Sequence, residues 1–319
     1  MNKMEFFNIS KENKQLTKID GKICGNLKPK ELNIQNFIEI SPTSLGSAYF
    51  LDGGIQEIFS TYNQSFYLLR FAYVKFKNEK RLSHEIFQTF IKTKNLQPLE
   101  CEISNELPFF QNKHIISAKD NPKETFISQI RRIFELKLAI HITQNMNQGE
   151  LLVLDGSLCP TEYDLEELKQ LINISNQKKI NLIGFSKNSQ LKSQSGAILN
   201  EEILTFSKSL DFKRWVCLDV FSDSTFADSA LKITTSFAYL HPLSNFSFRI
   251  DHLSNPLEAL SRLSTNSLDG TFLGYPYGLI IADKLARVKN EEKSYLYSKY
   301  FLSKNLIERQ NPHEILDTM

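Results

Sequence analysis

Two acidic side chains directly follow apolar runs that predict buried strands. Asp52 ends the run AYFLD at 48–52, and Asp155 ends LLVLD at 151–155; each is followed by glycine. A carboxylate at the carboxyl end of a parallel strand points into the crevice where α/β sheets bind ligands. Glycine at the next position lets backbone, metal or phosphate come close. The third Asp-Gly pair, Asp269-Gly270, follows the polar stretch STNS, and we interpret it as an ordinary turn.

Two further carboxylates lie inside apolar helical patterns. Glu135 occurs in IRRIFELKLAI at 130–140, and Asp283 occurs in GLIIADKLA at 278–286. An acid in such a context costs several kcal/mol unless it is paired or bound to a cation. Because four convergent carboxylates repel one another, and because hard divalent cations prefer carboxylate oxygens, the set predicts a site for Mg²⁺ or Mn²⁺.

Ordinary salt bridges are the alternative explanation for two of these acids. Glu135 follows Arg131 and Arg132 at helical spacing, and Asp283 precedes Lys284 and Arg287. For Glu135 taken alone the salt bridge is the better interpretation, and for Asp283 the two interpretations are balanced.

The elements around these acids predict an α/β protein. Asn121-Pro122-Lys123-Glu124 is a helix start, and it predicts a helix over 122–145. The run 151–155, an amphipathic helix opening at Thr161 and the run 181–186 then follow at the spacing of a β-α-β unit, which implies parallel strands.

The remaining chain is divided by pattern and composition. Aromatic and β-branched runs predict a hairpin of 48–52 with 65–76 and a second hairpin of 236–243 with 245–253. Residues 84–92 favour a helix, 113–117 a short strand, 256–266 a short helix and 276–301 one long helix. We expect four regions: an arm or cap at 1–45, a main domain at 46–304, an insertion within it at 190–235, and a tail at 305–319.

Composition excludes several classes of protein. The chain has 319 residues, with 38 Lys and Arg against 36 Asp and Glu, a net charge of +2, so it is not a binder held on nucleic acid by bulk charge. Its four cysteines form no CxxC or Cys/His cluster, which argues against structural zinc or a disulfide framework. With no signal-peptide core and no apolar run of the roughly 18 residues that a membrane span needs, a cytoplasmic location without membrane contact is expected.

The order of the acids and the motifs around them resemble a known family. Asp on a first strand, Glu on a helix, Asp ending the next strand and an acid on a late helix is the layout of ribonuclease-H-like nucleases. The chain is similar to NurA, a DNA end-processing nuclease that works with the HerA translocase. The motifs that carry the resemblance are FLDGG (50–54), RRIFE (131–135), LLVLDGSL (151–158), IGFSKNS (183–189), FRID (248–251) and GYPYGLIIADKLARV (274–288).

The resemblance implies a fold, an activity and partners. It implies a ribonuclease-H-like mixed sheet flanked by helices, and a homodimer docked on a HerA-like hexameric ATPase. It also implies a Mn²⁺- or Mg²⁺-dependent deoxyribonuclease that hydrolyses phosphodiester bonds with two ions. The implied activity is a 5′–3′ exonuclease of DNA end processing and repair that acts on single- and double-stranded ends, with single-strand endonuclease activity.

Five residues match the family's functional positions. Asp52, Glu135 and Asp155 match its metal ligands, and Lys187 matches a lysine that steadies the scissile phosphate or the attacking water. Asp283 stands where family members often have His, and it is kept as a fourth ligand and catalytic residue. The first motif also has Asp-Gly-Gly where the family has Asp-Gly-Ser.

Other interpretations remain open from the sequence. An actin- or hexokinase-like phosphotransferase would have a related sheet, but its phosphate turns read Asp-x-Gly, and no G-x-G occurs in this chain. A catalytically inactive protein that only docks on the ATPase would keep the fold. Tyr275 and Tyr277 could stack on a displaced base, although packing is the better interpretation in a chain so rich in aromatic residues.

Overall fold

The structure is a computed structural model that describes residues 27–29, 32, 34–94, 99–104, 107–111, 114–116, 122–161, 163–189, 191, 197–223 and 233–299. The first part of the expected arm and the expected tail at 305–319 therefore lie outside the described residues. The chain divides into two compact units. Unit 1 holds residues 1–51, 74–84 and 139–281, and unit 2 holds 52–73, 85–138 and 282–319. No helix in the described ranges has both the length and the apolar character to cross a membrane.

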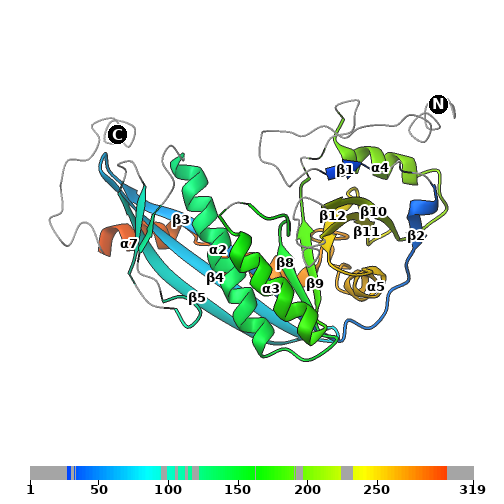
Figure 1. Ribbon diagram of the computed structural model, residues 1–319, viewed down its shortest axis with the longest axis horizontal. Helices are drawn as coiled ribbons and strands as arrows, with labels where there is room; N and C mark the ends of the chain where they lie inside the picture. Colours follow the sequence, from blue (N-terminus) through cyan, green and yellow to red (C-terminus); the bar gives the residue numbers. More distant parts are fainter. Residues whose placement is uncertain are drawn as a thin grey trace. The chain divides into compact units, whose positions relative to one another are not determined.

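Unit 1 contains a mixed sheet with strand order β1-β10-β11-β12-β9-β8-β3, and β2 pairs with β10 beside it (Figure 1). β8 is parallel to both β3 and β9, as the β-α-β spacing predicts, while the strands from β9 to β10 pair antiparallel. The strands of this sheet are β1 (Leu27–Pro29), β2 (Phe37–Glu39), β3 (Ser47–Ser60), β8 (Leu151–Asp155), β9 (Asn181–Ser186), β10 (Trp215–Asp223), β11 (Thr234–Tyr239) and β12 (Phe248–His252).

Three helices from the described part of the chain accompany this sheet, and the sequence predicts two of them, at 165–178 and 257–265. α3 (Leu165–Lys178) contacts β9, and α4 (Leu199–Ser207) contacts β11. α5 (Leu257–Thr265) follows β12, and a single 3-10 turn, η1 (Ile34–Asn36), precedes β2. The segment expected as an insertion thus contributes both α4 and the sheet strand β10, while the expected arm contributes β1 and β2.

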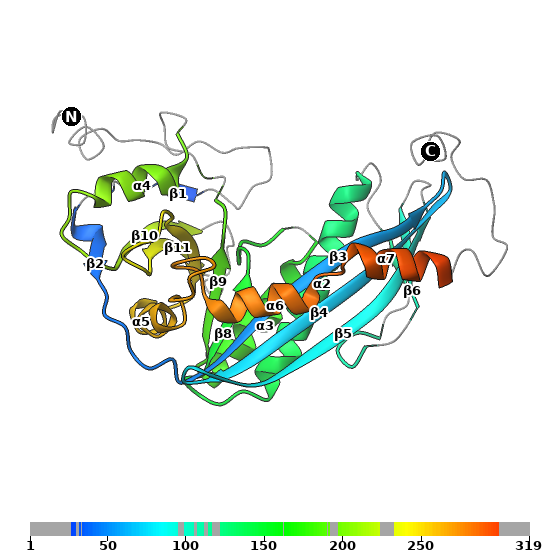
Figure 2. The same ribbon diagram turned by 180° about the vertical axis from the view of Figure 1, so that it is seen from behind.

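Unit 2 is built on the strands that follow Asp52. Figure 2 shows β3, β4 (Gln64–Lys77) and β5 (Lys80–Lys94) side by side, and β6 (Glu100–Ile103) and β7 (His114–Ile116) continue the order. α2 (Lys123–Gln144) supplies Phe134, whose ring lies 5.5 Å from Phe71 and 4.2 Å from Phe110. This aromatic stack fixes the face of α2 that carries Glu135.

Two predicted helices are wrong. Residues 84–92 lie in strand β5, where Thr89, Ile91 and Thr93 are buried at alternate positions, the period of a strand. The long helix predicted over 276–301 is two helices, α6 (Tyr277–Ala286) and α7 (Asn290–Tyr297). The chain leaves helical geometry between them because Val288 is buried against Ile58 and Leu68.

The other predicted elements are confirmed. The helix expected over 122–145 is α2, the short strand at 113–117 is β7, and the hairpin of 236–243 with 245–253 is the antiparallel pair β11–β12. The fold class predicted from the sequence, an α/β protein with a mixed sheet flanked by helices, is therefore correct.

Candidate active site

Asp155 in unit 1 is held by two donors, one on each carboxylate oxygen. The Tyr275 hydroxyl donates to Oδ1 at 3.0 Å, and Lys187 Nζ lies 3.0 Å from Oδ2. The Asp155 side chain is 19% exposed and that of Lys187 34% exposed, so the pair is reachable from solvent. The ammonium of Lys187 also lies 5.0 Å from the centre of the Tyr275 ring, which stabilises it there.

The neighbouring strands explain why Asp155 and Lys187 meet. β8 ends at Asp155, and the parallel strand β9 ends one residue before Lys187, so both side chains leave the same edge of the sheet. Gly184 in β9 leaves room for the turn after β8, because a Cβ there would lie 2.9 Å from the carbonyl oxygen of Gly156.

A buried carboxylate fixes the turn that follows Asp155. Asp251 in β12 is fully buried and accepts hydrogen bonds from the Ser157 hydroxyl at 2.5 Å and the Leu158 N–H at 2.9 Å. It also accepts from Thr235 at 2.6 Å and from Arg249 Nε at 2.9 Å. Every partner is a donor, so the network matches an ionised carboxylate.

The electrostatics of Asp251 agree with that match. Burial on its own would raise its pKa, but the charge of Arg249 and the hydrogen bonds from Ser157 and Thr235 lower the pKa below its ordinary value. An ionised Asp251 therefore ties β12 to the turn that presents Asp155.

In unit 2, Glu135 lies against Gly53, the residue that follows Asp52. The side chains of Asp52 and Glu135 are both buried. A Cβ built on Gly53 would lie 2.6 Å from Glu135 Oε1, so only glycine lets the helix carboxylate come this close to the strand. Arg131 fixes the arrangement, since it donates to the Gly53 carbonyl at 2.8 Å and lies 3.1 Å from Glu135 Oε1.

Asp283 shares a cavity with Asp52. The cavity has a volume of about 120 Å³, and its lining includes Asp52, Gly54, Asp283 and Arg287. Gly54 allows α6 to lie against β3, because a Cβ there would lie 2.4 Å from the carbonyl oxygen of Ala286. The Asp-Gly-Gly sequence thus has a structural reason: each glycine admits one of the elements that carries another carboxylate.

Arginines accompany two of these three acids, as the salt-bridge alternative predicts. Arg131 pairs with Glu135, and Arg287 pairs with Asp283 at 2.6 Å with a side chain that is 67% exposed. Within the described ranges, no three His, Cys, Asp or Glu side chains form a group that could hold a metal ion. The oxygen donors on the cavity wall are of the type that fits a hard divalent cation, but such a cation would have to replace these guanidinium contacts.

The five predicted site residues therefore fall into two groups. Asp155 and Lys187 belong to unit 1 and contact each other, while Asp52, Glu135 and Asp283 belong to unit 2. The prediction that all four acids serve one set of metal ions concerns both units and stays a prediction.

Several partners of the site have no clear signal in the sequence. Tyr275 is fully buried and donates to Asp155, so it is neither an open stacking surface nor merely a packing residue. Asp251 is recognisable only as part of FRID, and Ser157 and Thr235 are of types that occur throughout the chain. Their spacing along the chain is too large for a local pattern to reveal them.

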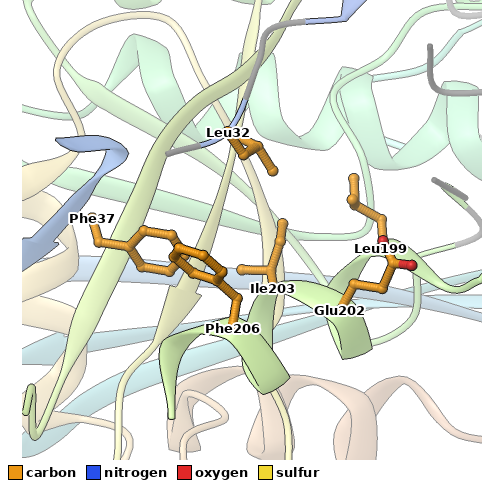
Figure 3. A pocket seen from close by; sticks show the side chains of 6 residues that line it. All are labelled: Leu32, Phe37, Leu199, Glu202, Ile203 and Phe206. Carbon is orange, nitrogen blue, oxygen red and sulfur yellow. The ribbon is translucent and has the colours of Figure 1, made fainter. Parts of the chain in front are cut away.

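An apolar pocket in unit 1 offers different chemistry. It lies between β2 and α4, and Figure 3 shows the six side chains that line it: Leu32, Phe37, Leu199, Glu202, Ile203 and Phe206. Five of them are apolar, and the sixth is a single carboxylate. The lining of this pocket is therefore mostly apolar, unlike the surroundings of Asp155.

Comparisons with known proteins identify the family to which the chain belongs. A crystal structure of the NurA nuclease from Sulfolobus solfataricus aligns with a TM-score of 0.52 and 16% identity, covering 89% of each chain. Another NurA crystal structure aligns with a TM-score of 0.53 and 10% identity, covering 89% of this chain and 93% of the other. At these identities the alignments show a shared fold. A search of curated proteins gives no match. The sequence matches the NurA domain over residues 46–288, which include all five predicted site residues, and the chain therefore belongs to the NurA family.

Proposed function

We propose that this protein is a divalent-metal-dependent deoxyribonuclease that hydrolyses phosphodiester bonds at DNA ends. Membership of the NurA family supports a nuclease. The observation that carries the proposal furthest is Asp155 at the end of β8, with Tyr275 on one carboxylate oxygen and Lys187 on the other. A partly exposed acid that is oriented by two hydrogen-bond donors is suited to act on a bound ligand.

The proposed ligand set is Asp52, Glu135, Asp155 and Asp283. Bound Mn²⁺ or Mg²⁺ would supply an activated water and stabilise the charge on the leaving oxygen, the usual role of a pair of ions in nucleases. The burial of Asp52 and Glu135 supports this set, because buried carboxylates call for positive charge nearby.

Each remaining group has a role that follows from its contacts. Tyr275 orients Asp155 through its hydroxyl, and Asp251 holds the adjacent turn. Lys187 pairs with Asp155 and, being partly exposed, is placed to contact a phosphate of the DNA. Arg287 is an exposed cation on the wall of the Asp52 cavity and is likewise suited to a phosphate.

The family also supports proposals on direction and partners. We propose digestion in the 5′–3′ direction, a homodimer, a HerA-type hexameric ATPase as partner, and a role in DNA end processing in the cytoplasm. None of the contacts described above depends on these proposals.

The experiment is degradation of DNA labelled at the 5′ or the 3′ end, single- or double-stranded, with Mn²⁺, Mg²⁺ or EDTA. We expect loss of full-length DNA with Mn²⁺ or Mg²⁺ and none with EDTA, and the 5′ label should be released first. Digestion that persists in EDTA contradicts metal dependence. An intact substrate, with and without a HerA-type ATPase, would instead indicate an inactive docking protein.

A further inference from the structure

A loop of unit 1 exposes two large apolar side chains. Leu243 is 73% exposed and Phe246 is 51% exposed, although they lie only three residues apart between β11 and β12. Single exposed apolar residues are common on proteins, but a local pair of this size calls for an explanation.

The loop is held rigidly in this conformation. The Ser244 hydroxyl accepts from the Phe246 N–H at 3.1 Å and donates to the Phe246 carbonyl at 2.9 Å. The Tyr239 hydroxyl lies 2.9 Å from the Pro242 carbonyl oxygen and 3.0 Å from that of Ser244. A Cβ on Gly274, which has a φ of +85°, would lie 3.0 Å from the Ser244 hydroxyl. The exposure of Phe246 is therefore built into the fold and is available without reorganisation on binding.

A chain of aromatic rings connects Phe246 with the candidate active site. The Phe246 ring packs edge-on against Phe272 at 5.6 Å, and Phe272 stacks on Tyr275 at 5.2 Å with an interplanar angle of 18°. Tyr275 donates to Asp155 through its hydroxyl. The exposed ring is thus two ring contacts away from a side chain that touches the proposed catalytic carboxylate.

We propose that Phe246 is a stacking platform for an unpaired base of the DNA strand whose backbone lies at Asp155 and Lys187. Aromatic side chains beside a cationic group are the usual means of binding single-stranded nucleic acid without sequence preference. Here the cation is Lys187, whose ammonium lies 5.0 Å from the centre of the Tyr275 ring. Tyr275 is the last of the three connected rings. Leu243 extends the apolar surface next to the platform.

Nucleic acid fits this surface better than a protein partner. The loop exposes two large apolar side chains, Leu243 and Phe246. Two side chains offer much less area than the roughly 800 Å² that each partner buries in a stable protein interface. The rings also lead inward to the carboxylate and lysine of the candidate site. The inference rests on the proposed function, since a strand must enter that site for a base to reach Phe246.

The experiment compares Phe246→Ala and Phe246→Trp with the wild type, using DNA that is kept uncleaved by Ca²⁺ in place of Mn²⁺. Tyr295→Ala and Tyr295→Trp are the matched controls, because Tyr295 is an exposed aromatic residue, 62% accessible, on α7. Affinity is measured for a single-stranded oligonucleotide and for a blunt duplex. Stacking of one base predicts that Phe246→Ala weakens single-strand binding roughly 5- to 150-fold, with less than about a twofold effect on the duplex.

Phe246→Trp tests the contact directly. The only tryptophan of the chain, Trp215, is 1% exposed. A change in tryptophan fluorescence of Phe246→Trp when DNA is added can therefore be assigned to the new, exposed side chain. We expect single-stranded DNA to quench the fluorescence of Phe246→Trp but not that of Tyr295→Trp.

The outcomes separate this inference from the proposed function. If the wild type cleaves DNA but Phe246→Ala binds single strands as tightly as the wild type does, the platform is refuted and the nuclease stands. If Phe246→Ala instead lowers the molecular mass in light scattering with unchanged DNA binding, the surface is a protein interface. If the wild type neither binds nor cleaves DNA, both proposals fail.

Discussion

At the scale of single residues, Gly53 shows how a missing side chain can shape a carboxylate site. Glu135 can approach β3 closely only because residue 53 has no side chain. A Cβ on Gly53 would also lie 2.8 Å from the Phe71 ring. We predict that Gly53→Ala destabilises the protein by about 1–3 kcal/mol through overpacking and reduces cleavage by more than the loss of folded protein.

The control is Gly270→Ala in the third Asp-Gly pair, where a Cβ would meet nothing within 4 Å. We expect it to stay within about 0.5 kcal/mol of the wild type in urea unfolding. Equal stabilities for the two variants would show that residue 53 does not limit the approach of Glu135.

Asp251 gives a pH-dependent prediction. Its pKa in the folded protein is lowered from the ordinary value of 3.8, so the ionised form stabilises the fold above pH 3.8, and this stabilisation is lost as the pH falls through the folded pKa. In Asp251→Asn an amide NH₂ faces a ring of donors, which costs about 3–5 kcal/mol at pH 7. The free energy of unfolding of both proteins is measured from pH 7 to pH 3. We expect the gap in this free energy between wild type and Asp251→Asn to narrow only below about pH 3.8. A difference that is constant with pH would mean that Asp251 is not ionised in the fold.

The sequence predicts these residues unequally. Asp52 and Asp155 can be found because an apolar strand ending in Asp-Gly is a local pattern. The Asp251 network cannot, because Ser157, Thr235 and Asp251 come from three separate segments that only the sheet brings together.

At the scale of elements, the β-α-β unit could be predicted because each element carries its own apolar period. The strand β5 could not be distinguished from a helix, since HEIFQTFIK has apolar residues that fit both periods and most of its first half is exposed. The break between α6 and α7 has no Pro or Gly to mark it. It depends on the burial of Val288 against two strands, which is tertiary information.

Arg262 joins three elements of unit 1 through a single side chain. From α5 it donates to the carbonyl oxygens of Leu45 at 2.8 Å, Gly149 at 2.9 Å and Ser47 at 3.0 Å. Burial lowers its pKa, which marks it as a largely desolvated cation. We predict that Arg262→Met destabilises the fold by about 2–5 kcal/mol, because three carbonyl groups lose their donor.

The matched control is Arg81→Met on the exposed half of β5, for which we expect a change within about 0.5 kcal/mol. Chemical denaturation of both variants measures the difference. If Arg262→Met is as stable as Arg81→Met, the anchoring of α5 does not depend on this guanidinium.

At the scale of the whole molecule, binding of metal ions by the proposed carboxylate ligands should stabilise the folded protein. A ligand at 100 times its dissociation constant adds about 2.7 kcal/mol to the unfolding free energy. We predict that Mn²⁺ raises the melting temperature of the wild type and raises that of Asp52→Asn much less. The Asp269 carboxylate only accepts a hydrogen bond within an ordinary turn. We therefore expect Mn²⁺ to raise the melting temperature of Asp269→Asn as much as that of the wild type. Equal shifts in all three proteins would exclude Asp52 as a ligand.

The most direct test of the central claim is metal-dependent cleavage of end-labelled DNA by wild type, Asp155→Asn and Asp269→Asn, each shown to be folded by its thermal transition. Loss of an orienting, ligand-binding carboxylate predicts that Asp155→Asn is slower by a factor of at least about 100, while Asp269→Asn cleaves at the wild-type rate. Cleavage by folded Asp155→Asn at the wild-type rate would contradict the account, because it would place the chemistry away from the carboxylate that Lys187 and Tyr275 hold.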